Sequence, residues 1–173
     1  MTEGGDGKAR GPRRRGPDVP LTVLGVRVEL PEQHHVVLLL NPEGDTMLPL
    51  WVGAPEAAAA ALALDAAPTP RPLTHELLVS VLAALGQTLE RVRLTEVRDD
   101  VVHAELHLSG GATVDARASD AVVLALRAEA PVLCDPAVLA EAGMDARGQE
   151  AGDEGELDDF RHFLDSVRPE DFG

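Results

Sequence analysis

The chain has 173 residues, of which 45 % are hydrophobic, enough for one compact domain with a buried core. Its formal net charge of −15 makes most of its surface repel a phosphate backbone, so a nucleic-acid ligand needs a local basic patch or a bridging cation. Aromatic residues make up only 2 %, which leaves little material for stacking bases. The single cysteine, Cys134, excludes an internal disulfide, and no apolar run is long enough to span a bilayer, so we expect a cytoplasmic protein.

The two ends of the chain differ in composition from its centre. Residues 1–18 contain Gly, Pro and Arg without periodicity and predict a disordered basic arm. Residues 144–156 are rich in Gly and acids and predict an acidic linker. Residues 157–173 predict a short C-terminal helix and tail, because apolar side chains recur at helical spacing there, at Leu157, Phe160, Leu164 and Val167. The folded domain is therefore expected over residues 19–143.

The first half of this domain predicts three strands followed by two helices. Alternation from Leu24 to Leu30 predicts a half-buried strand, and the apolar run from Val36 to Leu40 predicts a strand buried on both faces. A third strand is expected from Met47 to Val52. An Ala-rich helix is expected from Pro55 to Leu64, and a second helix from an N-cap at Thr74 to a stop at Gly86. The second helix carries an apolar stripe made of Leu77, Leu78, Val81, Leu82 and Leu85.

The second half predicts a similar order of elements. Strands are expected from Leu89 to Arg98, from Val102 to Leu108 and up to Ala116, with a Gly110-Gly111 turn between the last two. A nearly all-apolar helix from Asp120 to Ala128 should be buried. A short strand from Pro131 to Cys134 and a last helix, capped by Asp135 and ending at Gly143, complete the domain.

An internal match suggests that the two halves are repeats. The segment Trp51-Val52-Gly53-Ala54-Pro55-Glu56-Ala57 aligns with Asp115-Ala116-Arg117-Ala118-Ser119-Asp120-Ala121 at an offset of 115 − 51 = 64 residues. Both segments run from a strand through a short turn to an acid, an alanine and an apolar helix. The predicted fold class is therefore α+β, a single compact domain built from a duplicated β-β-β-α-α unit around a strongly curved mixed sheet.

The first group of candidate site residues lies at the start of the second helix. His75 and Glu76 occupy its first turn, and Arg71 lies just before it. Arginine can bind a phosphate bidentately, and histidine can act as a general acid or base near neutral pH. A structural explanation is also open, in which Glu76 complements the helix dipole and Arg71 pairs with a nearby acid.

The second group lies at the turn from the last long strand into the buried helix. Asp115 and Asp120 could share a Mg²⁺ or Mn²⁺ ion, and Arg117 could offset charge on a phosphate. Glu56, the repeat-mate of Asp120, could complete a carboxylate cluster if the two helix starts meet. The structural alternative is that Ser119 caps the helix, that Glu56 and Asp120 are ordinary first-turn acids, and that Arg117 pairs with Asp115.

A third pattern, His103-x-Glu105-x-His107, puts three possible zinc ligands on one face of a strand. The polar, solvent-facing side of a half-buried strand produces the same pattern. Cys134 has no evident base partner and is expected to be a buried thiol.

These motifs resemble the bifunctional nuclease domain family over roughly Val23 to Gly143. The resemblance is carried by Pro70-Arg71-Pro72-Leu73-Thr74-His75-Glu76-Leu77, Val114-Asp115-Ala116-Arg117-Ala118-Ser119-Asp120-Ala121, Leu48-Pro49-Leu50-Trp51-Val52-Gly53, Glu56-Ala57 and Leu85-Gly86. Beyond this range, the ending Arg168-Pro169-Glu170-Asp171-Phe172 also resembles actinobacterial members of the family. The chain departs from the family pattern at Glu76, where Asp is usual, at Ala118, where Pro is usual, and near Val102-His103, where an aromatic pair is often seen.

The resemblance implies a homodimeric nuclease that acts on DNA and RNA. The expected catalytic residues are His75, Glu76, Asp115 and Asp120, the substrate-binding residues are Arg71, Arg117 and Ser119, and the metal ligands are Asp115, Asp120 and Glu56, holding Mg²⁺ or Mn²⁺. The rival hypothesis is a non-enzymatic dimeric module that binds a protein partner or a small anion at the same turns. The acidic surface and the scarcity of aromatics favour the rival.

Overall fold

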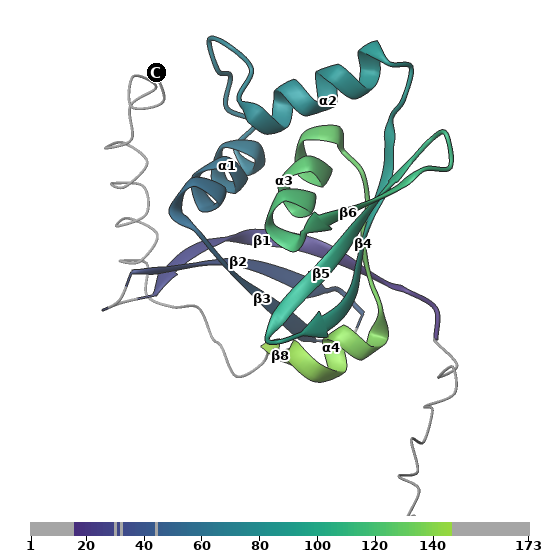
Figure 1. Cartoon of the computed structure of the whole chain (residues 1–173). Helices are drawn as coiled ribbons and strands as arrows, with labels where there is room; N and C mark the ends of the chain where they lie inside the picture. The colour runs from purple at the N-terminus through teal and green to yellow at the C-terminus, as the bar shows by residue number, and fades with distance from the viewer. Residues whose placement is uncertain (1–15, 30, 32, 44, 147–173) are drawn as a thin grey trace, which may run out of the picture.

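The structure is a computed structural model that describes residues 16–29, 31, 33–43 and 45–146. These residues form one mixed sheet of eight strands, in the order β6-β5-β4-β7-β1-β2-β3-β8, and four helices (Figure 1). The α+β class and the single compact domain are confirmed, whereas the duplicated unit and the strong curvature of the sheet stay predictions. None of the described helices is long and apolar enough to cross a membrane.

The first half contributes three antiparallel strands and two helices, close to the predicted bounds. The central strand of the three pairs with both of its neighbours, and Val36 to Leu39 are buried in it, as expected for a strand covered on both faces. The observed elements are β1 (Val19–Glu29), β2 (His34–Asn41), β3 (Thr46–Val52), α1 (Ala54–Leu64) and α2 (Thr74–Ala84).

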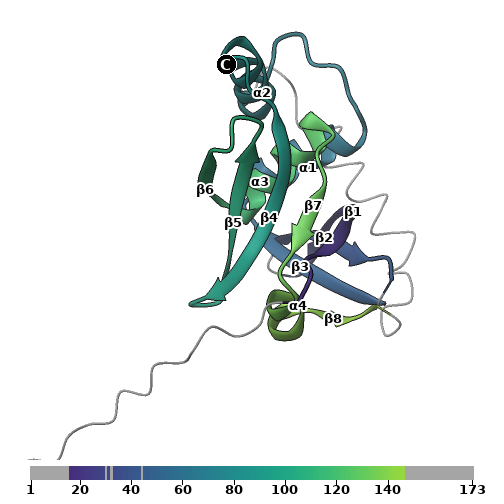
Figure 2. The same ribbon diagram turned by 90° about the vertical axis from the view of Figure 1, so that its right-hand side faces the viewer.

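The second half adds a second antiparallel group of strands and connects it to the first. The short strand β7 pairs in parallel with β4 and antiparallel with β1, so it is the link between the two groups (Figure 2). The last strand, β8, lies within the predicted acidic linker and pairs with β3. The observed elements are β4 (Leu89–Arg98), β5 (Val101–Leu108), β6 (Thr113–Arg117), α3 (Ala118–Ala128), β7 (Val132–Cys134), α4 (Pro136–Ala142) and β8 (Met144–Asp145).

Helix α3 is the centre of the helical layer. Its predicted burial is confirmed, and its buried side chains share one core with α1 and with strands from both halves of the chain. Apart from Cys134, the described residues of this core are Val, Leu and Ala, as the composition predicts. Cys134 is part of it as a buried free thiol, and burial raises the pKa of this thiol to about 12.

The apolar stripe of α2 is mostly exposed. None of the residues of α2 is buried, and the exposed fraction within the stripe rises to 71 % for Leu85 just beyond the helix. α2 packs on α3 at the outside of the helical layer, which leaves this side uncovered by the described residues (Figure 1). Only Leu82 of the stripe packs against the core, and the exposed members are Leu77, Leu78, Val81 and Leu85.

Three predicted signals at helix ends can be compared with the structure. Asp135 caps α4 as predicted, because its side chain accepts a hydrogen bond from the Ala137 N–H at 3.0 Å. Gly86 follows the end of α2 with a φ of +71°, the left-handed conformation that favours glycine. Thr74, however, is the first helical residue of α2, and the N-cap is Leu73.

A partly buried ion-pair network fixes the N-terminal end of β1. Arg93 donates two hydrogen bonds to Asp18, at 2.8 and 2.9 Å, and one to Asp135 at 2.9 Å. Asp18 belongs to the predicted arm, most of which lies outside the described residues. These three side chains tie the chain before β1 to β4 and to the start of α4.

Candidate functional site

Acids occupy the same position in three helices. Glu56, Glu76 and Asp120 are each the third residue of α1, α2 and α3, respectively. The unpaired backbone N–H groups of a helix N-terminus favour negative charge at this position. The sequence therefore places one carboxylate at the start of each of these three helices. The contacts of each carboxylate show which side chains it binds.

Arg117, the N-cap residue of α3, connects two of these acids. Its Nε donates to Oδ2 of Asp120 at 2.6 Å, and its Nη2 donates to Oδ1 of Asp120 at 3.0 Å and lies 3.0 Å from Oε1 of Glu56. The hydrogen bonds and charge of Asp120, followed by those of Glu56, raise the pKa of Arg117. The structural alternative of an Arg117–Asp115 pair is not observed.

His75 extends this arrangement to α2. Its Nε2 lies 3.3 Å from Oδ1 of Asp120, so the starts of α2 and α3 meet through their side chains. Burial would raise the pKa of Asp120, but the hydrogen bonds and charges of Arg117 and His75 lower it below its ordinary value of 3.8. We call the connected side chains His75, Asp120, Arg117 and Glu56 the ionic quartet.

Glu76 is not part of the quartet. Its carboxylate accepts hydrogen bonds from the Leu73 N–H at 3.0 Å and the Thr69 hydroxyl at 2.9 Å, and it lies 2.9 Å from Arg127 in the last turn of α3. Burial would raise its pKa, but these two hydrogen bonds and the charge of Arg127 lower it below the ordinary 4.5. Glu76 thus joins the start of α2 to the end of α3.

The remaining predicted residues lie around the quartet without joining it. Asp115 is exposed on β6, directly opposite Glu105 of β5, while the adjacent Ala116 faces the buried Ala104. Arg71 is exposed in the loop before α2. Neither the Asp115 nor the Arg71 side chain forms a hydrogen bond or an ion pair with any described residue. Ser119 is half-buried at the start of α3 and makes no capping hydrogen bond.

The arrangement of the quartet does not fit a bound Mg²⁺ or Mn²⁺ ion. Glu56 and Asp120 are the two predicted metal ligands that lie close together, but the guanidinium of Arg117 is bound between their carboxylates. A divalent cation there would have to displace a positive group that already satisfies both acids. Within the described part of the chain, no three His, Cys, Asp or Glu side chains are grouped closely enough to hold a metal ion.

The same absence of a metal-binding group includes His103, Glu105 and His107 on β5, the predicted zinc pattern. His107 Nδ1 lies 3.1 Å from a guanidinium nitrogen of Arg91, and its Nε2 lies 3.5 Å from Glu105. These contacts between neighbouring strand residues resemble the polar side of a strand more than a zinc site.

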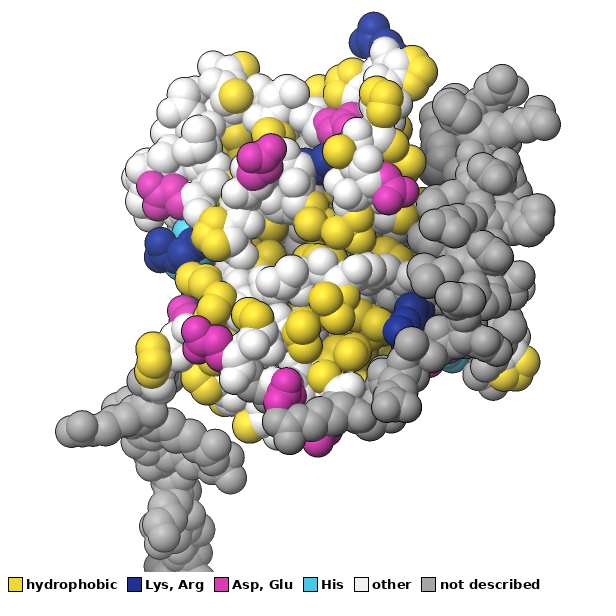
Figure 3. Space-filling model, turned by 180° about the vertical axis from the view of Figure 1, so that it is seen from behind, with side chains coloured by type: hydrophobic (Ala, Val, Ile, Leu, Met, Phe, Trp, Pro, Cys, Tyr) yellow, Lys and Arg dark blue, Asp and Glu magenta, His cyan; other side chains and the backbone are white. Residues whose placement is uncertain are grey.

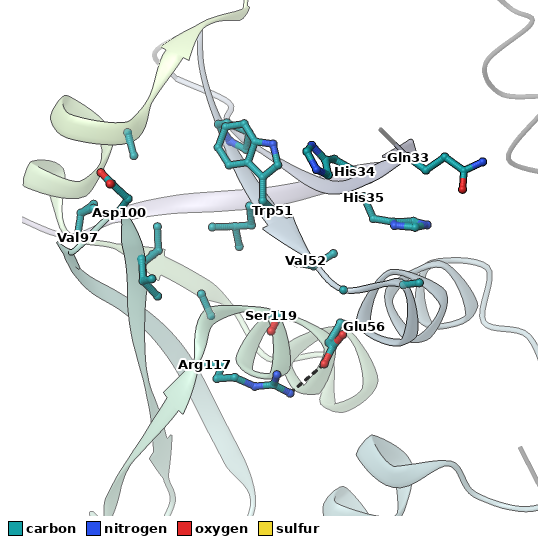
Figure 4. Close-up of a pocket in the computed structure, with 18 residues that line it drawn as sticks. Gln33, His34, His35, Trp51, Val52, Glu56, Val97, Asp100, Arg117 and Ser119 are labelled. Carbon is teal, nitrogen blue, oxygen red and sulfur yellow. Dashed lines mark ion pairs between the residues drawn. The ribbon is translucent and has the colours of Figure 1, made fainter. Parts of the chain in front are cut away.

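A pocket of about 650 Å³ lies beside the quartet, in the size range of small-ligand sites. Glu56, Arg117 and Ser119 line it, whereas His75 and Asp120 do not. Figure 4 shows these three side chains below a second group contributed by β2 and β3. The second group was not among the predicted site residues and includes His34, His35 and Trp51, with Asp100 of the β4–β5 turn nearby.

The surface around the described domain has no continuous basic patch on the face seen in Figure 3. Lys and Arg side chains appear there singly, among hydrophobic and acidic side chains. Phosphate recognition on this face therefore has little support from charge, which is consistent with the net charge of −15.

Comparisons with known proteins identify relatives of the chain. Residues 37–147 match the sequence profile of the family described as "Bifunctional nuclease domain". Two uncharacterized proteins of Mycobacterium tuberculosis, one from each of two strains, are 42 % identical over 156 residues, which cover 87 % of this chain and 95 % of each relative. The matched range includes all four residues of the quartet.

Proposed function

Because the chain belongs to the bifunctional nuclease domain family, we propose that it hydrolyses phosphodiester bonds of DNA and RNA at the ionic quartet. The observation that carries this proposal is the connection of His75 through Asp120 to Arg117 at the edge of the pocket. A proton-transferring imidazole, an orienting carboxylate and a phosphate-binding cation are the groups that this reaction needs.

Each residue of the quartet has a separate role in the proposal. The side chain of Arg117 is 67 % exposed, and its Nη1 makes none of the described hydrogen bonds, so this nitrogen can donate to a phosphate oxygen. Asp120 holds the His75 ring in one orientation. Because His75 does not line the pocket, it would pass the proton to the leaving oxygen, or take it from the attacking water, through one bridging water. Glu56 keeps Arg117 in place. Ser119 lies beside Arg117 on the pocket wall and is a further donor to the substrate.

A requirement for Mg²⁺ or Mn²⁺ is a separate proposal. It would need Arg117 to leave Glu56 and Asp120, and Asp115 to approach them. Cleavage that EDTA abolishes, that Mg²⁺ or Mn²⁺ restores and that Asp115→Ala lacks would support the ion. Cleavage of equal rate in EDTA would contradict it.

The experiment that tests the function is cleavage of labelled single- and double-stranded DNA and RNA by rigorously purified protein. The parent is compared with Arg117→Ala and His75→Ala purified in the same way. Cleavage by the parent that both variants lose supports the proposal. Equal cleavage by all three proteins would point to a contaminant, and no cleavage by the parent under any ionic condition would reject the activity.

A non-enzymatic dimeric binding module is the second candidate. The observation that favours it is the pairing of Arg117 with two carboxylates, since a satisfied ion pair can serve structure alone. We propose the exposed apolar side of α2 as the dimer contact. The binding module would be supported by a dimer that binds a protein partner or a small anion and cleaves neither DNA nor RNA.

A further inference from the structure

Trp51 has an unusual position for a large apolar side chain. It is the only tryptophan of the chain, its exposed fraction is 61 %, and it lies on the wall of the pocket that Arg117 also lines. A tryptophan that only filled the core would be buried, because its large apolar surface favours removal from water. The exposed indole is therefore available to a flat ligand.

The strand that carries Trp51 leaves room for such a ligand. β3 pairs with β2 along its whole length, but β8 pairs with it only at Thr46 and Met47. From Leu48 onward, the second edge of β3 is unpaired within the described chain, and residues 49–52 of this edge line the pocket. Pro49 suits such an edge, because proline has no N–H to donate to a further strand.

A polar side chain lies next to the indole. Trp51 is directly opposite Val36 in the β2–β3 register, and His34 is two residues from Val36, so His34 and Trp51 share one face as diagonal neighbours. Figure 4 shows the two rings beside each other, with Arg117, Glu56 and Ser119 further along the pocket. The pocket thus has an aromatic platform with a hydrogen-bonding ring at one end and a guanidinium at the other.

We propose that Trp51 stacks an unpaired nucleobase of a single-stranded substrate, whose phosphate lies at Arg117. This inference rests on the proposed function and names the substrate class of the same site. A base can reach the indole face only outside a duplex, so single strands should bind better than duplexes. Stacking does not depend on charge, and it supplies affinity where a chain of net charge −15 offers few phosphate contacts.

The single tryptophan makes the proposal directly measurable, because all indole fluorescence of the chain comes from Trp51. The full chain is titrated with a phosphorothioate deoxyadenylate octamer, with the duplex that this octamer forms with its deoxythymidylate complement, and with an abasic octamer of the same length. Fluorescence quenching reports contact with the indole, and the anisotropy of a dye on the octamer reports binding. Trp51→Ala, Trp51→Phe and Leu24→Ala are titrated in parallel by anisotropy, Leu24 being exposed and outside the pocket.

We expect saturable quenching by the single-stranded octamer, weaker quenching by the duplex and none by the abasic strand. Trp51→Ala should weaken binding about 5- to 150-fold, while Trp51→Phe and Leu24→Ala should stay within about threefold of the parent. The stacking inference would be overturned if the parent bound and cleaved the single strand without quenching and Trp51→Ala bound it with unchanged affinity. The nuclease proposal would still stand in that case. A chain that neither binds nor cleaves any of these strands, nor RNA, would overturn both.

Discussion

Glu56 and Asp120 occupy the same position of two different helices and share one guanidinium, that of Arg117, at 3.0 and 2.6 Å. An internal match of seven residues at an offset of 64 predicts their equivalence, and the structure brings both helix starts together at Arg117. The two acids do not form an open carboxylate cluster. Instead, they bind the guanidinium of Arg117, whose side chain also lines the pocket.

Arg117→Ala is expected to lower the rate of phosphodiester cleavage about 10²- to 10³-fold, the loss typical of removing one group that stabilises developing charge. The matched control is Arg98→Ala, because Arg98 is also exposed, pairs with one acid, Glu96, and does not line the pocket. The measurement is the initial cleavage rate of a labelled single strand. If Arg98→Ala lost as much activity as Arg117→Ala, the assignment of Arg117 would be wrong.

His75→Ala should lower the cleavage rate about 10²- to 10⁴-fold if its imidazole transfers the proton. Asp120→Asn should also lower the rate, because the 3.3 Å contact that orients the ring loses its charge. Residues that act as one unit are not additive, so the double variant should be no slower than His75→Ala alone. Losses that multiply in the double variant would show that the two residues act independently.

Glu76→Gln tests a structural role by its pH dependence. The pKa of Glu76 is lower in the fold than its ordinary 4.5, so its stabilisation is complete above about pH 4.5 and is lost as the pH falls through the lower folded value. We expect the variant to be less stable by about 1 kcal/mol at neutral pH. Between about pH 6 and about pH 3 the parent should lose more unfolding free energy than the variant. Parallel stability curves, measured by urea unfolding at each pH, would contradict this role.

Arg93→Met should destabilise the domain by about 3 kcal/mol, because it leaves Asp18 and the buried Asp135 without their cation. Arg98→Met is the control from an exposed ion pair, and its effect should be below about 1 kcal/mol. Both values come from denaturant unfolding monitored by circular dichroism. Equal effects of the two substitutions would show that burial of the Arg93 network adds nothing.

The exposed side of α2 predicts the assembly of the chain. If this helix forms the dimer contact, Val81→Glu places a charge in an apolar interface and should convert a dimer into a monomer in sedimentation velocity runs at micromolar concentration. Glu90→Gln on β4 is a control on an exposed residue outside this surface and should leave the dimer intact. A parent that sediments as a monomer at every concentration would remove the dimer proposal.

The sequence predicted most elements within a few residues, because alternation on strands and the turn residues between them are local signals. It missed β8, since two residues in a Gly- and acid-rich stretch carry no periodicity. Helical periodicity showed that α2 has an apolar side but could not show whether anything covers that side. At the site, helix position predicted the acids, yet the preference of Arg117 for Glu56 and Asp120 over Asp115 depends on how the helices pack. The role proposed for Trp51 depends on its exposure, which a strand pattern does not specify.

The position of β7 sets a condition on how this domain can be synthesised. Val132 to Cys134 are the only described residues that pair with both β1 and β4, so the sheet is not continuous until the ribosome has extended the chain beyond them. Arg117 and Glu56, made earlier, come from opposite sides of that junction. During translation the emerging chain should therefore expose its Val- and Leu-rich strands until late, and a stalled product ending before residue 132 should depend on chaperones and should lack the assembled pocket.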